Sequence, residues 1–112
     1  MSFVDTKGVE VIYGALAVKP ESISADGVID IRNGKIVMDS SGGALALTLP
    51  DGLVDGQLLI IEHGVAGNNA VVTYNGASTA TFNAAKETLL LGWSETVSDW
   101  VVYLNIGSVA LA

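Results

Sequence analysis

Only one pair of neighbouring side chains combines a histidine with a carboxylate. His63, the single histidine of the chain, directly follows Glu62. Adjacent residues of a regular strand point to opposite faces, so these two side chains cannot both enter one site. A zinc site would have to take its other ligands from carboxylates, because the chain has no cysteine. We therefore interpret His63 as a structural residue at the end of a strand.

The loop Asp51-Gly52-Leu53-Val54-Asp55-Gly56 superficially resembles a calcium loop. It lacks the dense carboxylate spacing and the closing glutamate of an EF-hand, and its Asp-Gly pairs are what turns require. The sequence also has no Gly-x-Ser-x-Gly elbow and no glycine-rich phosphate motif. A pair of carboxylates can be picked from any chain with twelve acidic residues, so it predicts nothing here. We expect no catalytic residues, no cofactor, no metal and no enzymatic activity.

The charge of the chain excludes some classes of partner. The net charge is −7 over 112 residues, and the five basic residues are scattered along the chain. Without a basic stripe to neutralise phosphates, neither nucleic acid nor anionic lipid is expected as a partner. No apolar run approaches the roughly 20 residues of a membrane helix, and no signal-peptide pattern is present. We expect a soluble intracellular product, unless the chain leaves the cell in an assembled particle or by lysis.

The stretch Ala44–His63 is the clearest sign of an all-β fold. Leu45, Leu47 and Leu49 alternate with smaller residues, which is typical of a strand with one face in a core. After a turn, Leu58–Ile61 is apolar at four consecutive positions. Such a strand has two apolar side chains on each face, and leaving one pair in water forfeits about 1.5–3 kcal/mol per side chain. We expect both faces to be covered, the second by another subunit.

Two further strand predictions concern the first third of the chain. Val9–Val18 reads as one long strand, in which Gly14 indicates a bulge or a close backbone approach. Within Val28–Asp39, the dipeptide Asn33-Gly34 predicts a two-residue β-hairpin. That register puts four apolar residues on one face: Ile29, Ile31, Ile36 and Met38.

The last third of the chain predicts two more strands. In Glu87–Trp93, Leu89, Leu91 and Trp93 share the inner face and Leu90 lies on the other. In Trp100–Ile106, the alternation predicts inward side chains at Trp100, Val102, Leu104 and Ile106, and outward ones at Val101, Tyr103 and Asn105. The five candidate sugar-stacking aromatics, which we interpret rather as core or interface anchors, are Trp93, Trp100, Tyr103, Tyr74 and Tyr13.

Short strands at spacings of roughly 8–12 residues are typical of a β-sandwich or small barrel. We therefore predict an all-β fold, a small antiparallel β-sandwich or jelly-roll-like barrel of about eight short strands. Residues 1–8 have no periodicity and are predicted to form a flexible N-terminal arm, followed by a single β domain over residues 9–112. The sequence has no clean internal repeat.

From Leu45 to Val102 the chain resembles a recurrent module of tailed-bacteriophage structural proteins. The resembling pieces are Leu47-Thr48-Leu49-Pro50-Asp51-Gly52, Asp55-Gly56-Gln57, Gly67-Asn68-Asn69-Ala70-Val71-Val72, Thr79–Phe82, Leu89-Leu90-Leu91-Gly92-Trp93 and Trp100-Val101-Val102. Capsid decoration (cement) proteins and head or tail fibre modules carry such segments. The resemblance implies β-structured homotrimers on the virion surface, without enzymatic activity. A fibre usually has a longer chain with repeats, which favours decoration.

The expected function is therefore that of a phage capsid decoration protein, which binds the outer capsid surface as a homotrimer and stabilises the shell. Its partners would be the major capsid protein and itself, and its location the capsid surface of the virion after synthesis in the host cytoplasm. The alternative is a fibre-type receptor- or glycan-binding module. The residues predicted to form the subunit or capsid interface are Phe3, Val4, Leu58, Ile60, Leu90 and Tyr103.

Overall fold

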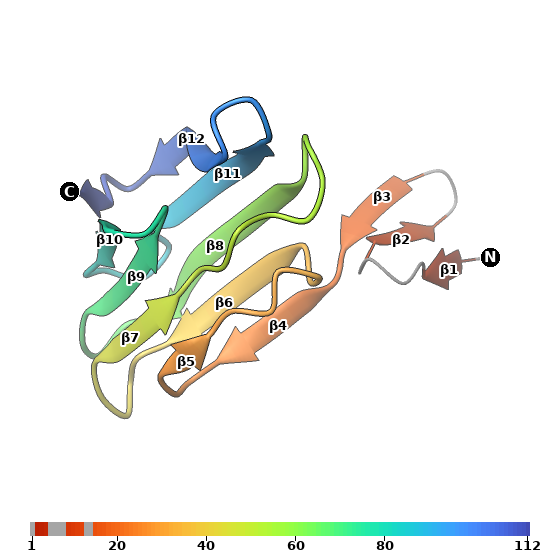
Figure 1. The fold of residues 1–112 in the computed structure, drawn as a ribbon. Helices are drawn as coiled ribbons and strands as arrows, with labels where there is room; N and C mark the ends of the chain where they lie inside the picture. Colours follow the sequence, from red (N-terminus) through yellow and green to blue (C-terminus); the bar gives the residue numbers. More distant parts are fainter. Residues whose placement is uncertain (1, 5–8, 13–14) are drawn as a thin grey trace.

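The fold is a sandwich of two five-stranded β-sheets with the hydrophobic core between them (Figure 1). The structure, a computed structural model, describes the backbone of residues 2–4, 9–12 and 15–112, and the side chains from Val18 onward. We name the sheets by their central strands. The β8 sheet has the order β12-β11-β8-β6-β4, and the β9 sheet has the order β13-β10-β9-β7-β5. The prediction of an all-β sandwich is confirmed.

The strands of both sheets are short. The β8 sheet contains β4 (Pro20–Ile23), β6 (Lys35–Asp39), β8 (Leu58–Val65), β11 (Thr88–Ser94) and β12 (Asp99–Ile106). The β9 sheet contains β5 (Gly27–Val28), β7 (Leu45–Thr48), β9 (Ala70–Tyr74), β10 (Ser78–Phe82) and β13 (Ala110–Leu111).

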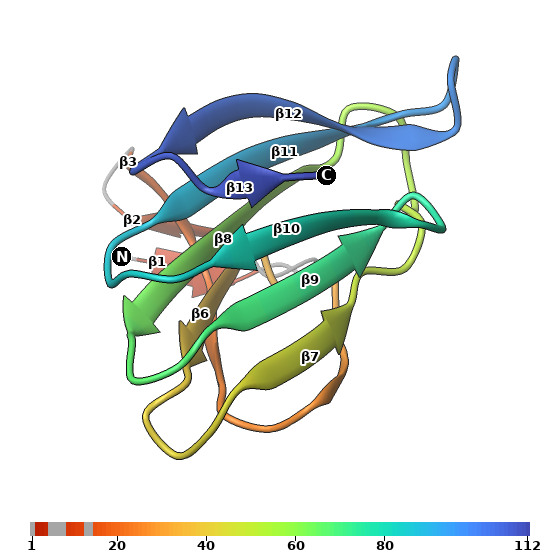
Figure 2. The same ribbon diagram turned by 90° about the vertical axis from the view of Figure 1, so that its left-hand side faces the viewer.

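Between β4 and β9 the chain changes sheet after every strand. As a result β4, β6 and β8 are parallel neighbours in one sheet, and β5, β7 and β9 are parallel neighbours in the other. These strands form three coils of a short two-sided solenoid, which then reverses at the β9–β10 hairpin (Figure 2). The later strands, β10 to β13, pair antiparallel. The strand pairing is therefore mixed, and the predicted wholly antiparallel pairing is wrong. After each strand the chain crosses to the other sheet and comes back in the same direction, so successive strands of one sheet are parallel.

The predicted hairpin at Asn33-Gly34 is wrong. The strands on either side of it, β5 and β6, lie in different sheets, and β6 pairs in parallel with β4 and β8. Asp30 holds the turn instead. Its carboxylate accepts a hydrogen bond from the backbone N–H of Arg32 at 3.1 Å and two from the Arg32 guanidinium at 2.9 and 3.0 Å. The four predicted inward side chains are nevertheless buried, with exposed fractions between 0 and 7%: Ile29, Ile31, Ile36 and Met38.

The predicted single strand Val9–Val18 is also wrong. It is divided into β2 (Val9–Ile12) and β3 (Ala15–Val18), which pair antiparallel. The two halves therefore form adjacent strands, and β1 (Ser2–Val4) pairs with β2 to complete a separate three-stranded sheet. Gly14 lies outside the described residues. Of the predicted arm, Ser2–Val4 form β1, while residues 1 and 5–8 lie outside the described residues.

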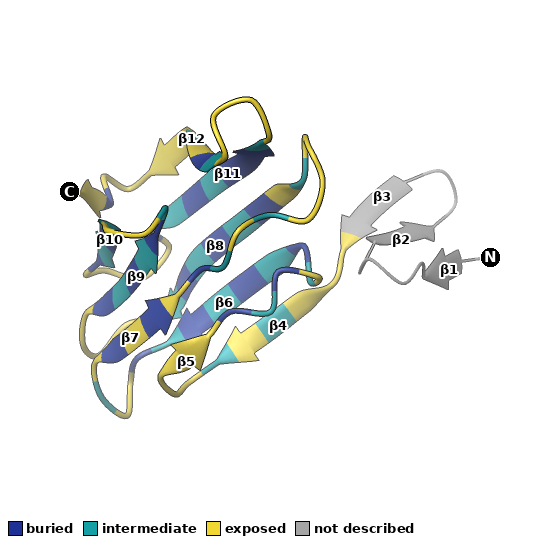
Figure 3. Cartoon of the chain, in the orientation of Figure 1, coloured by how far each residue is buried: buried dark blue, intermediate teal, exposed yellow. Residues whose placement is uncertain are grey.

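The core is built from the alternating side chains that the sequence indicates (Figure 3). Seven inward residues of β7, β8 and β11, together with Leu49 directly after β7, are no more than 5% exposed: Leu45, Leu47, Leu49, Leu59, Ile61, Leu89, Leu91 and Trp93. Trp93 packs edge-to-face on Trp100, with ring centroids 5.6 Å apart. The Trp100 indole donates a hydrogen bond to the Pro50 carbonyl at 2.8 Å. Both indoles thus anchor the end of the core with their polar atoms satisfied.

Side chains take the place of missing strands at several sheet edges. The Asn75 side chain accepts from the Trp100 N–H at 2.7 Å and donates to its carbonyl at 2.9 Å. Asn105 makes the same pair of bonds with Val109, at 2.8 and 2.9 Å, and Asp26 accepts the Ala46 N–H at 2.8 Å. These contacts satisfy backbone groups that would otherwise recruit a foreign strand.

The substitution Asn75→Asp tests this edge capping. Aspartate tolerates the positive φ of 52° at this position, but it loses the donor to the Trp100 carbonyl and places a negative charge beside it. The free energy of unfolding is expected to fall by about 1–3 kcal/mol in urea titrations at one protein concentration. Asn69→Asp, at an exposed loop position, is the control and should change it little. Equal values for the two variants would contradict the capping role.

Candidate contact surface

The outer face of the β8 sheet brings together four of the six residues predicted to form an interface. Leu58 and Ile60 lie on β8, Leu90 on β11 and Tyr103 on β12, three strands that are neighbours in the sheet. Leu58 and Tyr103 are 55% and 53% exposed, and Ile60 and Leu90 are half-buried. Phe3 and Val4 lie on β1, in the part of the chain whose side chains the structure does not describe.

The strand register arranges the outward residues in rows across the sheet. Leu58 lies opposite Gly92, which lies opposite Val101. In the next row, Ile60 lies opposite Leu90, which lies opposite Leu104. Residues directly opposite each other share a face and contact one another. We call the resulting apolar surface the outer band; it consists of Leu58, Ile60, Leu90, Val101, Tyr103, Leu104 and Ile106.

A β-bulge in β12 extends the outer band beyond what the sequence predicts. The register between β11 and β12 shifts between Leu90 and Leu91, so that Tyr103 is the extra residue on β12. Past a bulge the alternation of side chains is inverted. The prediction that Leu104 and Ile106 point inward is therefore wrong, since they are 54% and 56% exposed. Before the bulge, Trp100 and Val102 face the core as predicted, with Val102 only partly buried.

Gly92 makes room for the ring of Tyr103. A Cβ atom at Gly92 would lie 2.3–2.5 Å from three atoms of the phenol, so a larger residue there would displace the ring. The ring covers the glycine and still leaves half of Tyr103 exposed. An aromatic side chain held in place by the sheet beneath it is a typical anchor of protein interfaces.

Charged residues occur at the margin of the outer band. Lys35 on β6 is aligned with Ile60, and its Nζ lies 3.6 Å from the carboxylate of Glu62 on β8. Both side chains are about one-third exposed, at 32% and 33%. A contiguous exposed apolar patch with a polar margin is typical of an interaction site.

His63 occupies a sealed polar node on the opposite side of β8. Its Nε2 lies 2.7 Å from the Ser40 hydroxyl, and both residues are fully buried. The same hydroxyl lies 2.6 Å from the Asn68 carbonyl and accepts the backbone N–H groups of Gly67 and Asn68. Through the Ser40 hydroxyl this node connects β8 to the loop that follows it, in line with the structural role expected for His63.

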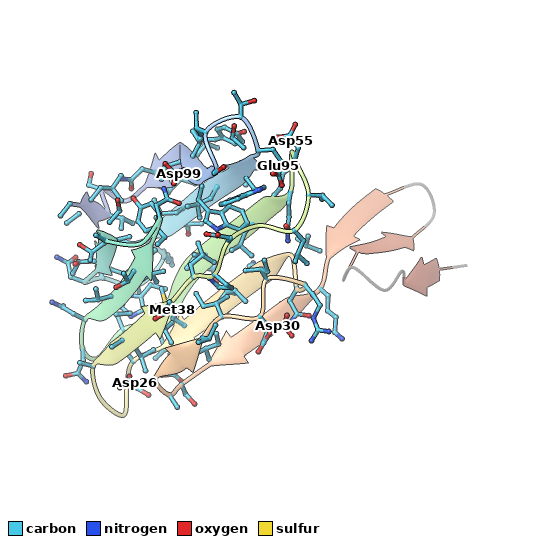
Figure 4. All side chains as sticks on the ribbon, viewed as in Figure 1. Asp26, Asp30, Met38, Asp55, Glu95 and Asp99 are labelled. Atoms are coloured by element: carbon cyan, nitrogen blue, oxygen red, sulfur yellow. The ribbon has the colours of Figure 1, made fainter. Side chains whose placement is uncertain are left out.

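Several of the described acidic side chains accept local hydrogen bonds, among them Asp26, Asp30, Asp55 and Glu95, which Figure 4 labels. Asp55 accepts the backbone N–H of Glu95, whose carboxylate accepts the Trp93 indole N–H, each at 2.9 Å. Asp26 and Asp30 are engaged at other loops, as described above. Within the part of the chain that the structure describes, no three His, Cys, Asp or Glu side chains are placed to hold a metal ion.

The aromatic candidates separate into core and surface. Trp93, Trp100 and Tyr74 are 4%, 3% and 7% exposed, and burial raises the pKa of the Tyr74 phenol. Tyr103 is the member of the set that reaches the surface among the described side chains, and Tyr13 lies outside them. The prediction of core or anchor roles is thus confirmed for the two tryptophans and Tyr74.

No protein-family model matches the chain, and no curated protein matches it. Among the described residues, no helix is long and apolar enough to cross a membrane. Function is therefore inferred from the outer band and the chemistry around it.

The turn after β6 leads to a prediction on pH. The Asp39 carboxylate accepts the hydroxyl and the backbone N–H of Ser41, at 2.6 and 2.9 Å, and these bonds hold the pKa of Asp39 below its usual value. A carboxylate whose pKa is lower in the folded state stabilises the fold at pH values above its unfolded pKa of about 3.9. This stabilisation is lost as the pH falls through the pKa of the folded state. Asp39→Asn should lower stability at pH 7 and flatten its decline below about pH 5.

Urea unfolding of the wild type and of Asp39→Asn over a series of acidic pH values measures this slope. Asp51→Asn, on the exposed loop before β8, is the matched control. An unchanged slope in Asp39→Asn would contradict the role of the Ser41 contacts.

Proposed function

We propose that the chain is a non-enzymatic capsid decoration protein of a tailed bacteriophage. It binds the outer surface of the shell as a homotrimer, with the major capsid protein and itself as partners, after synthesis in the host cytoplasm. The outer band is the observation that supports this most. It concentrates half-exposed apolar side chains on one sheet face of a chain with a net charge of −7, and such a patch is typically covered by a partner.

The mechanism is mass action. A protein that binds only the assembled shell stabilises that state by RT ln(1 + [L]/Kd), which amounts to about 2.7 kcal/mol per site at one hundred times the dissociation constant. A rigid body suits this role, because little conformational freedom is lost when sheet residues form the contact. The side-chain caps at Asn75, Asn105 and Asp26 favour a defined oligomer over open-ended strand addition. Phe3 and Val4 on β1 remain candidates for the capsid contact.

The alternative, a fibre-type receptor- or glycan-binding module, is less well supported. Sugar binding by stacking needs exposed aromatic rings, but Trp93, Trp100 and Tyr74 are in the core. Among the described side chains, this leaves Tyr103 as the exposed member of the predicted aromatic set. One ring within an apolar band fits a protein contact better than a sugar site.

Binding to capsids tests the proposal. Purified chain is added to expanded capsids of the phage that encodes it, prepared without this protein, and the mixture is sedimented. We expect saturable co-sedimentation and a higher temperature of capsid disruption, because the chain binds the assembled state alone. Deleting residues 1–8 should weaken binding if Phe3 and Val4 contact the shell. Capsids that bind no chain and keep the same disruption temperature would contradict the proposal, and specific hits on a glycan array would favour the alternative.

A further inference from the structure

We infer that the outer band is the contact between copies of this chain, so that the bands of three copies face one another about a common axis. The number of copies rests on the proposed function, whereas the choice of surface rests on three features of the band. These are its lack of charge, the pair of opposite charges at its margin, and its position on paired strands.

Charge favours a second copy as the occupant. Every copy carries a net charge of −7, so copies repel one another wherever acidic surfaces meet. The outer band avoids this repulsion, because β11 contains no charged residue and residues 100–112 contain none either. Two of the three strands of the band can therefore approach an identical copy without bringing like charges together, apart from Asp99 at the start of β12.

The margin of the band is complementary to itself. Lys35 and Glu62 present a cation and an anion side by side, each about one-third exposed and so able to accept a second partner. Lys35 of one copy can pair with Glu62 of another copy where these two margins meet. Opposite charges around an uncharged centre set the register of a contact and disfavour wrong partners.

The band also has the make-up of an interface centre. Cores of protein interfaces are poor in charge and enriched in tyrosine, and Tyr103 stands in the middle of the apolar rows with Gly92 beneath it. Because its residues lie on paired strands, they lose little freedom on association. Val28 is more exposed, at 71%, but lies on the two-residue β5 in the other sheet, so it serves as an external reference.

The absence of cysteine from the sequence allows a direct test. Leu104→Cys places one thiol in the band and Val28→Cys places one outside it, at positions that are 54% and 71% exposed in the single chain. At concentrations where the chain is associated, a maleimide should label Leu104→Cys at least tenfold more slowly than Val28→Cys. Dilution to the monomer should remove the difference.

Lysine variants at the same positions give a second readout. Leu104→Lys should sediment as a monomer and Val28→Lys as a trimer, both with the far-ultraviolet circular dichroism of the wild type. Ile106→Cys and Ile106→Lys, at a position that is 56% exposed, replace the Leu104 variants if those fail to fold.

Each other result overturns the inference. Equal labelling in a trimer would mean that the copies meet elsewhere, and slow labelling only after capsids are added would make the band the capsid contact. A chain that stays monomeric at every concentration would show that free copies do not contact one another. In all three cases capsid binding, measured separately by co-sedimentation, decides whether the proposed decoration role survives.

Discussion

Burial of side chains between the two sheets is the interaction on which the rest of the molecule depends. Each fully buried leucine or isoleucine contributes about 1.5–3 kcal/mol through the area removed from water. The three coils from β4 to β9 deliver inward residues from both sheets to this single core. Because side chains alternate along a strand, the choice of inward residues also determines which ones face out. The outer band is therefore a consequence of how the core is filled.

One local irregularity changes that outcome on β12. Regular alternation would bring Leu104 and Ile106 into the core, but the bulge at Tyr103 turns both side chains outward. Asn105 then faces the turn before β13, where its amide binds the backbone of Val109. The bulge thus gives up two inward apolar side chains, closes the edge of the sheet and enlarges the apolar outer face. The unpaired residue Tyr103 thus determines which side chains of β12 contribute to the outer band.

Burial could be predicted from the sequence more fully than pairing could. The alternation in Leu45–Leu49 and in Leu89–Trp93 fixes the buried face whichever strand lies alongside. For the same reason Ile29, Ile31, Ile36 and Met38 are buried although the predicted hairpin is absent. Asn33-Gly34 favours a hairpin locally, but the energy of packing β6 between two parallel neighbours prevails.

The candidate surface was predictable only in part. The uninterrupted run Leu58–Ile61 and the position of Leu90 indicate strands that are apolar on both faces, and this identifies three of the seven residues of the outer band, Leu58, Ile60 and Leu90. Leu104 and Ile106 could not be found, because a bulge depends on the register with β11 and leaves no mark in the alternation of β12 itself. The solenoid coils follow the same path between the two sheets but do not share a residue pattern. The solenoid could therefore not be predicted from a sequence repeat.

If other copies of this chain cover the outer band, the free protein must associate. Sedimentation equilibrium of the unmodified chain over a wide dilution series measures this association. We expect a particle with three times the 11.5 kDa mass of one chain, which dissociates on dilution. A single 11.5 kDa species at every concentration would contradict it, because the apolar face of β8, β11 and β12 would then remain in water in the free protein.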